Sequence, residues 1–125
     1  MKRIIKSSKV PEPIGPYNQA VMVGNMLYTS GQIAINPTTN QLEVNDIQQE
    51  TKLVMENLKA LLEEAEMGFS NVIKCSIFIS DMNNFGKINE VYGSYFTSNY
   101  PARETVEVSR LPKDVNVEIS LIAVK

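Results

Sequence analysis

The last fifth of the chain, residues 101–125, constrains the fold most, because polar and apolar residues alternate there on both sides of a turn signal. Leu111-Pro112-Lys113-Asp114 has the composition of a turn, and successive side chains of a strand point to opposite faces of a sheet. The pattern predicts two strands that pair as a β-hairpin, with Arg110 opposite Val115. The apolar face of this hairpin carries Val106, Val108, Val117, Ile119 and Leu121. The polar face carries Arg103, Thr105, Glu107, Ser109, Asn116, Glu118, Ser120 and Ile122.

The polar face of the predicted hairpin has more than one interpretation. A sheet with one apolar and one solvated face is common, and its charged groups then need no partner. A guanidinium, a hydroxyl and two carboxylates on one rigid hairpin could equally form the floor of a site for a small anion. Because Ile122 lies among the polar residues, a contact between identical subunits is a third interpretation.

The remaining segments predict an α+β protein with a single domain, residues 1–125. Strands are expected over residues 3–7, 18–23, 26–30 and 72–80; the second and third form a hairpin around Gly24-Asn25, and Gly31 interrupts the third. Apolar positions that step by four and three from Ile47 predict a helix that Asp46 caps and Gly68 ends. A second helix is expected over residues 85–96. This order predicts a mixed six-stranded sheet with both helices packed on one face.

The composition excludes several classes of chemistry. The 125-residue chain is 43% hydrophobic and 21% charged, as folded proteins are, and its net charge of −2 argues against nucleic-acid binding. Histidine is absent, so Ser-His-Asp and Cys-His mechanisms are excluded and acid–base chemistry falls to carboxylates, Tyr, Lys or water. The single Cys75 cannot form an internal disulfide and argues against a zinc site. The first residues resemble neither a signal peptide nor a membrane span, so a cytoplasmic location is expected.

Arg103 and Glu118 are the strongest candidates for a chemical role. Arg103 follows Pro101-Ala102 at the start of a strand, and its planar fork can bind a carboxylate through two parallel hydrogen bonds. Glu118 lies in the middle of the final strand, where a half-buried carboxylate could hold and activate water. The alternative for Arg103 is a surface ion pair with Glu118 or Glu107, which is a common arrangement of little energetic value. The alternative for Glu118 is a solvent-facing position as the cross-strand partner of Glu107 or Arg103.

Three further residues are candidates for binding. Ser30 and Gly31 lie where a strand is interrupted, which would expose a hydroxyl and backbone N–H groups to an anion. Without a base to activate it, Ser30 has at most a binding role. Tyr17 lies in a loop stiffened by Pro13 and Pro16, which would place its ring as a pocket wall or its phenol as a donor. A tyrosine that simply lies on the sheet edge is equally compatible with the sequence.

Several motifs together resemble the RidA/YjgF family of reactive-intermediate (enamine/imine) deaminases, and the match is close to RidA proper. The resemblance is carried by residues 13–20 (PIGPYNQA), 28–33 (YTSGQI), 71–74 (NVIK), 78–82 (FISDM), 89–92 (NEVY), 101–108 (PARETVEV) and 111–114 (LPKD). These motifs span essentially the whole chain. The resemblance implies a chorismate-mutase-like fold assembled as a homotrimer, with three clefts between neighbouring subunits.

The resemblance also implies roles for the candidate residues. In the intersubunit cleft, Arg103 would clamp the carboxylate of the substrate and Glu118 would position the attacking water. Tyr17 and Ser30 would shape the cleft, and Gly31 would allow close approach of the backbone.

At position 105, where many relatives have Cys, this chain has Thr105, which can still donate and accept hydrogen bonds in the pocket. The implied activity is hydrolysis of 2-iminobutanoate and 2-iminopropanoate, or of their enamine tautomers, to 2-ketoacids and ammonia. PLP-dependent dehydratases produce these compounds from threonine and serine. The resemblance implies no metal and no cofactor.

Two other functions stay open. The same cleft could bind a ketoacid without turnover, as a regulatory module that acts on an enzyme or a repressor. Some relatives have been described as ribonucleases or translation inhibitors, and the acidic charge and absent histidine weaken that interpretation here.

Overall fold

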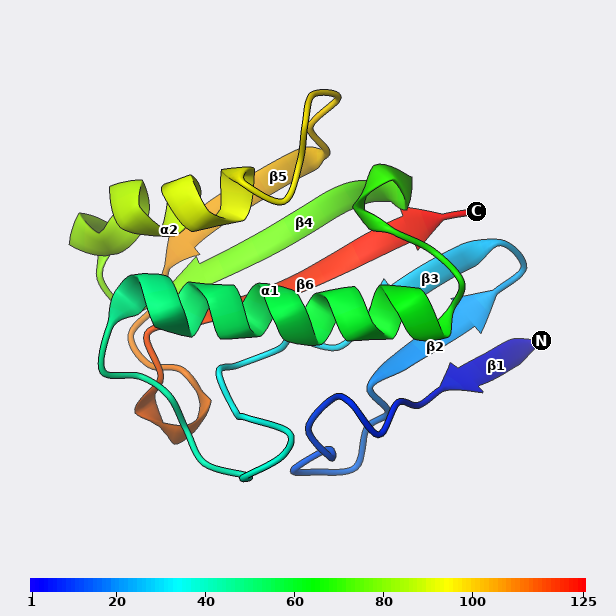
Figure 1. Ribbon diagram of the computed structural model, residues 1–125, viewed down its shortest axis with the longest axis horizontal. Helices are drawn as coiled ribbons and strands as arrows, with labels where there is room; N and C mark the ends of the chain where they lie inside the picture. The colour runs from blue at the N-terminus through cyan, green and yellow to red at the C-terminus, as the bar shows by residue number, and fades with distance from the viewer.

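The computed structural model describes residues 1–125 and contains one six-stranded sheet with two α-helices (Figure 1). The strands are β1 (Lys2–Ile5), β2 (Ala20–Val23), β3 (Met26–Thr29), β4 (Val72–Ile79), β5 (Ala102–Glu107) and β6 (Val117–Val124). Their order across the sheet is β1-β2-β3-β6-β4-β5, and every neighbouring pair is antiparallel except β4 and β5. The mixed α+β sheet predicted from the sequence is therefore confirmed.

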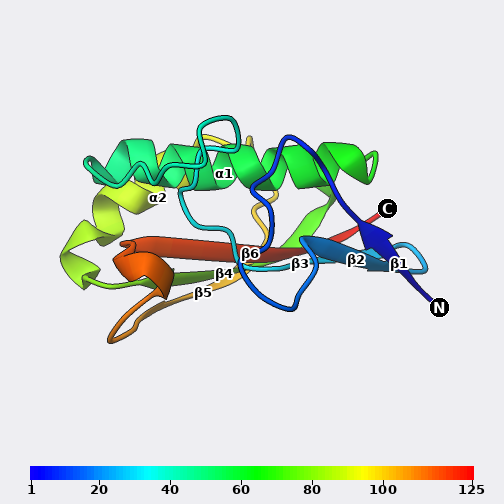
Figure 2. The same ribbon diagram turned by 90° about the horizontal axis from the view of Figure 1, so that it is seen from below.

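Both α-helices cover the same face of the sheet (Figure 2). Helix α1 (Ile47–Glu64) begins at Asp46, whose carboxylate accepts hydrogen bonds from the N–H groups of Gln48 and Gln49 at 2.8 and 3.1 Å. This confirms the predicted cap, which satisfies N–H groups that a helix N-terminus leaves free. Helix α2 (Phe85–Gly93) packs beside α1, and three short 3₁₀ helices are η1 (Phe69–Asn71), η2 (Met82–Asn84) and η3 (Pro112–Asp114). No helix has the length and apolar character needed to cross a membrane.

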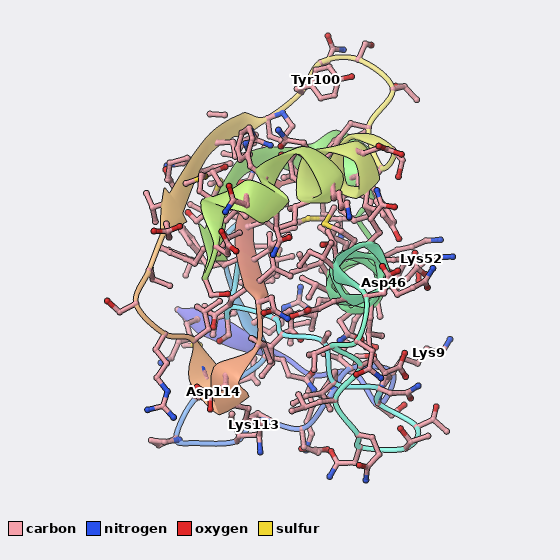
Figure 3. All side chains as sticks on the ribbon, turned by 90° about the vertical axis from the view of Figure 1, so that its left-hand side faces the viewer. Lys9, Asp46, Lys52, Tyr100, Lys113 and Asp114 are labelled. Carbon is pink, nitrogen blue, oxygen red and sulfur yellow. The ribbon has the colours of Figure 1, made fainter.

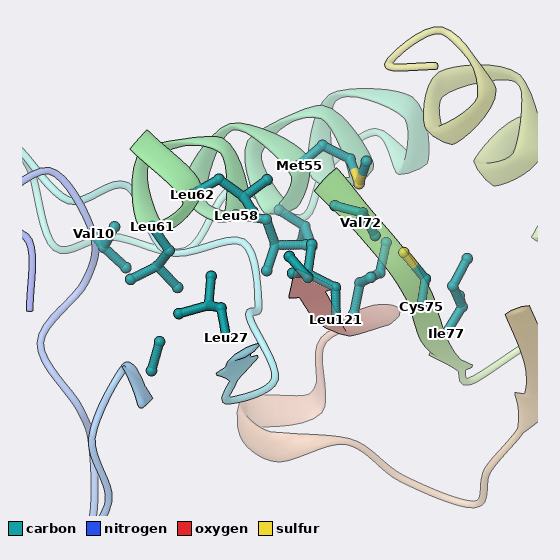
Figure 4. Close-up of a cluster of buried hydrophobic side chains, with 14 of the residues drawn as sticks. Val10, Leu27, Met55, Leu58, Leu61, Leu62, Val72, Cys75, Ile77 and Leu121 are labelled. Carbon is teal, nitrogen blue, oxygen red and sulfur yellow. The ribbon is translucent and has the colours of Figure 1, made fainter. Parts of the chain in front are cut away.

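The main core lies between α1 and the sheet (Figure 4). Leu58 and Leu61 of α1 are fully buried and belong to the same apolar cluster as Leu27 of β3 and Ile77 of β4. Cys75 of β4 is fully buried in this cluster. The helices therefore bury the apolar side chains on one face of each central strand.

The C-terminal segment does not form the predicted hairpin, because β4 lies between β5 and β6. Strand β5 runs parallel along one edge of β4, and β6 runs antiparallel along the other. Residues 108–116 join the two strands. Val106 is consequently 41% exposed on the uncovered face, whereas Val117, Ile119 and Leu121 are buried as predicted. Alternation of residue types identifies the two faces of a strand, but it does not show whether a third strand is inserted between two that follow each other in sequence.

Helix α1 closes at Glu66 rather than at Gly68. Glu66 adopts a left-handed conformation, with φ of 59°. The Met67 N–H donates to the Leu62 carbonyl at 2.8 Å, and the Glu66 N–H donates to the Glu63 carbonyl at 2.9 Å. These two bonds form a Schellman motif, which most often has glycine at the left-handed position.

The face of the sheet opposite the helices is not covered within the chain (Figure 2). Its apolar side chains include Ile4, Val23, Tyr28 and Val106, all more than 40% exposed. The same face carries Lys74, which forms an ion pair with Glu104 at 2.9 Å. It is therefore a mixed surface with both apolar and charged residues.

Candidate functional site

The residues predicted to bind or react lie in two separate pockets. The Glu118 pocket, of about 290 Å³, is lined by Ile14, Tyr17, Ser30, Gly31, Ile33, Pro112 and Glu118. The Arg103 pocket, of about 370 Å³, is lined by Asn89, Tyr92, Gly93, Tyr100, Pro101 and Arg103. Figure 3 shows the separation: Tyr100 of the Arg103 pocket and Lys113, which follows a residue of the Glu118 pocket, lie at opposite ends of the view.

The Glu118 pocket forms where β3 leaves β6. At Thr29, the last residue of β3, the side-chain oxygen takes the place of a backbone carbonyl and accepts a hydrogen bond from the Leu121 N–H at 2.9 Å. Backbone pairing resumes at Gln32, which exchanges hydrogen bonds of 2.8 and 3.2 Å with Ile119. The intervening residues bulge away from β6, as the sequence predicted for Gly31.

Gly31 is required by the position of the Glu118 side chain. A Cβ atom added at Gly31 would lie 2.7 Å from Cδ of Glu118 and 2.9 Å from its Cγ. Such distances are closer than van der Waals contact, so any other residue at position 31 would displace the carboxylate. In the single chain, the group that approaches Gly31 closely is the Glu118 side chain. The predicted close approach of the backbone in the intersubunit cleft stays a prediction.

Tyr17 and Ser30 line the same pocket and are held by hydrogen bonds to backbone. The Tyr17 hydroxyl accepts a hydrogen bond from the Ile14 N–H at 3.2 Å, and the ring is 44% exposed. The Ser30 hydroxyl donates to the Asn18 carbonyl at 2.6 Å. Both side chains therefore have fixed positions at the pocket wall, and the Ser30 oxygen keeps lone pairs available.

The Glu118 carboxyl group is perturbed by its surroundings. Burial raises its pKa above the ordinary value of 4.5, and no hydrogen bond or neighbouring cation lowers it again. A carboxylate with a raised pKa is a stronger base when ionised, and such groups are concentrated at functional sites.

The Arg103 pocket lies between β5 and α2. The Arg103 guanidinium donates a hydrogen bond to Oδ1 of Asn89 at 2.6 Å and lies over the rings of Tyr92 and Phe85, at 5.1 and 5.6 Å from their centroids. No carboxylate lies within ion-pair distance of it. The surface ion pair considered as an alternative is thus absent. Glu107 instead accepts a hydrogen bond from the Met82 N–H at 2.7 Å.

Two buried hydroxyl groups near Arg103 have no hydrogen-bond partner within the chain. One belongs to Thr105, two residues along β5 on the same face, and the other to Tyr92. Burial raises the pKa of Tyr92. Since buried polar groups are nearly always satisfied, these two hydroxyl groups are exceptions in the chain.

The structure corrects the predicted arrangement of the site. Arg103 and Thr105 pair in register with Cys75 and Ile77 of β4, on the face that the helices cover. Glu118 lies on the uncovered face, so it does not share a face with Arg103. The structure brings Tyr17, Ser30, Gly31 and Glu118 together, and separately places Arg103 beside Thr105.

Sequence reasoning missed the residues of α2 that contact Arg103. Phe85, Asn89 and Tyr92 all lie in the helix predicted over residues 85–96, and Asn89 and Tyr92 belong to the 89–92 motif, but sequence reasoning did not connect them with Arg103. The signal in the sequence is their spacing of four and three residues, which places all three side chains on the same side of a helix. No three Cys, Asp or Glu side chains gather where they could bind a metal ion.

Comparison with known proteins assigns the chain to a family. Residues 7–125 match the family described as Endoribonuclease L-PSP. The chain is 50% identical to a RutC family protein of Pyrococcus abyssi, over 99% of this chain and 98% of that protein. It is 44% identical, over 100% of this chain and 98% of the relative, to an Escherichia coli protein named "Putative reactive intermediate deaminase TdcF".

Solved structures agree with these sequence matches. A crystal structure of E. coli TdcF with bound serine has a TM-score of 0.94 and 44% identity, with 98% of each chain covered. The crystal structure of RidA from an Antarctic Psychrobacter has a TM-score of 0.95 and 36% identity, covering 98% of this chain and 99% of that one. The fold and site thus define a protein of the RidA class. The chain belongs to the RidA/YjgF family, which includes the RutC and TdcF proteins, and the predicted resemblance is confirmed.

Proposed function

We propose that this protein is a 2-iminobutanoate/2-iminopropanoate deaminase that hydrolyses reactive imines, or their enamine tautomers, to 2-ketoacids and ammonia. The observation that carries the proposal is the Arg103 guanidinium, which is held in an open pocket with no carboxylate partner. An oriented guanidinium without a counter-ion is suited to bind the carboxylate of a small substrate. The serine bound in the crystal structure of TdcF is a small carboxylate of this kind.

The active site would form between subunits of a homotrimer. Arg103 and Glu118 lie on opposite faces of the sheet, so they cannot bind one small molecule within a single chain. Joining the Arg103 pocket of one subunit to the Glu118 pocket of the next would bring the two together. The exposed apolar side chains of the uncovered face support such an assembly, because symmetric oligomers bury surfaces of this kind.

The reaction would proceed by addition of water to the C=N bond. Arg103 binds the substrate carboxylate and so orients the imine carbon. Ionised Glu118 accepts a proton from a water molecule while the water oxygen bonds to the imine carbon. Glu118 then passes this proton to the imine nitrogen. The hydroxyl proton of the resulting carbinolamine then passes to its nitrogen, and as the C–N bond breaks and the C=O bond forms, ammonia and the ketoacid are released. Positioning and proton transfer are the contributions of the protein.

The test couples the protein to a serine/threonine dehydratase and follows ketoacid release in a buffer that slows spontaneous hydrolysis. Wild type should accelerate release, and Arg103→Ala should lower kcat/KM about a hundredfold, because it removes the charge-assisted hydrogen bonds to the substrate carboxylate. Arg103→Lys should also be impaired because it lacks the bidentate fork. Arg3→Ala, which removes an exposed arginine of β1, is the matched control and should be unchanged.

Two results would contradict the proposal. If wild type gives no acceleration, the protein is not a deaminase for these imines; ketoacid binding without turnover would then favour a regulatory module. Full activity in Arg103→Ala would remove the assigned carboxylate site.

A further inference from the structure

One face of α2 is directed at Arg103. Phe85, Asn89 and Tyr92 are four and three residues apart, which places them on the same side of the helix. All three contact the guanidinium of Arg103. Helix α2 therefore lines the Arg103 pocket and also contacts the Arg103 guanidinium directly.

These contacts orient Arg103 without neutralising it. The two aromatic rings attract a cation through their negative faces, and Asn89 accepts one hydrogen bond with an uncharged oxygen. A guanidinium has five N–H groups, so most of its donors remain available to a ligand. An aspartate at position 89 would also hold Arg103, but it would supply the counter-ion that a substrate must otherwise provide.

The ring of Tyr92 is itself firmly held. It is only 5% exposed, and its centroid lies 5.1 Å from that of Phe96, which in turn lies 5.4 Å from that of Phe69. An immobile ring fixes the guanidinium that lies over it, so less conformational entropy is lost when a ligand binds.

We infer that Phe85, Asn89 and Tyr92 are positioning residues that hold Arg103 as an oriented, uncompensated cation, and that this face of α2 thereby sets the affinity for the substrate carboxylate. The inference rests on the proposed function in that Arg103 is the carboxylate site. It adds that the strength of binding is determined by uncharged groups on the helix.

The first test measures binding of 2-oxobutanoate to the intact assembly by calorimetry. Phe85→Leu and Tyr92→Leu should each weaken binding about fivefold, because each removes one cation–π contact. Tyr92→Phe keeps the ring over Arg103, so it should weaken binding less than Tyr92→Leu does. Tyr95→Leu is the matched control: it removes an aromatic side chain near α2 whose ring packs on Phe69 and lies over neither Tyr92 nor the Arg103 guanidinium. It should bind 2-oxobutanoate as wild type does.

The second test separates positioning from a merely structural role. Asn89→Asp should keep or increase resistance to denaturant, because it gains an ion pair with Arg103. It should nevertheless weaken 2-oxobutanoate binding about tenfold or more, since Arg103 then already has a counter-ion. Loss of affinity without loss of stability is not expected of a residue that only supports the fold.

The possible failures are distinguishable. If Arg103→Ala loses binding while Tyr92→Leu, Phe85→Leu and Asn89→Asp all bind as wild type, the inference about α2 is wrong and the proposed function stands. If wild type accelerates imine hydrolysis but binds no ketoacid, the inference about α2 is wrong and the proposed function stands. If Arg103→Ala both binds 2-oxobutanoate and hydrolyses imines as wild type does, both are overturned.

Discussion

Gly31 is the residue whose replacement should have the most local effect on the Glu118 pocket. Gly31→Ala would place a Cβ 2.7 Å from Cδ of Glu118, so the carboxylate must move. We expect a loss of about 1–3 kcal/mol in unfolding free energy, which is typical of overpacking, together with loss of most deaminase activity. Gly86→Ala in α2, where an added Cβ meets nothing within 4 Å, should keep both properties in urea unfolding and ketoacid-release assays. Full activity in Gly31→Ala would show that the position of Glu118 is not critical.

Glu118 should make stability depend on pH with an unusual sign for a carboxylate. Its raised pKa means that the folded state binds the proton more tightly than the unfolded state. Its contribution to stability is therefore complete below the unfolded pKa, and it is lost as pH rises through the folded pKa. Glu118→Gln cannot ionise, so it should be inactive yet more stable than wild type at pH 7, with the difference vanishing below about pH 4.

Glu104→Gln is the control of opposite sign, because Ser76 and Lys74 lower the pKa of Glu104. The stabilisation by Glu104 is present above the unfolded pKa and is lost as pH falls through the folded pKa. Glu104→Gln should therefore be less stable than wild type at pH 7. Urea unfolding at several pH values measures both effects; a Glu118→Gln variant less stable than wild type at pH 7 would contradict the assigned burial.

At the scale of an element, the end of α1 can be improved. Glu66 holds a left-handed conformation that costs a non-glycine residue about 1 kcal/mol, so Glu66→Gly should stabilise the protein by about that amount. The ion pair between Glu66 and Lys125, at 3.4 Å, is exposed and worth little. Glu66→Ala loses the same ion pair without relieving the backbone. A chemical denaturation curve in which the Gly and Ala variants are equally stable would rule out strain at this position.

The elements themselves were predictable because each depends on nearby residues. The cap at Asp46, the turn at Gly24-Asn25 and the interruption at Gly31 all follow from side chains acting within a few positions. The neighbour of a strand is instead set by packing across the whole sheet. This is why β5 and β6 were expected to pair, although β4 lies between them.

For the candidate site, the same difference in scale separates what sequence reasoning found from what it missed. Arg103, Glu118, Tyr17 and Ser30 were identified from residue type and motif, and all four line pockets. Their division between two pockets follows from the strand order, which the alternating pattern does not contain. The role of Asn89 depends on α2 lying against β5, and that is a tertiary contact.

For the whole molecule, the division of the site predicts that activity requires more than one chain. Light scattering should give about three times the 14.0 kDa mass of one chain. Arg103→Ala and Glu118→Gln should each retain about one per cent of wild-type activity or less when alone, because every cleft lacks one group. When the two variants are unfolded, mixed equally and refolded together, about one cleft in four should combine an intact Arg103 from one subunit with an intact Glu118 from the next, if assembly is random.

The mixed assembly should therefore recover about a quarter of wild-type ketoacid release. Refolding Arg103→Ala with the double variant Arg103→Ala/Glu118→Gln is the control, and it should recover nothing. If the site were formed within one chain, every chain in the mixture would lack either Arg103 or Glu118, so the mixture would stay inactive. Arg103 and Glu118 lie on opposite faces of the sheet in one chain, so a site that contains both must combine residues from two neighbouring subunits. If a mixed trimer of the correct mass recovered no activity, the shared site would be contradicted.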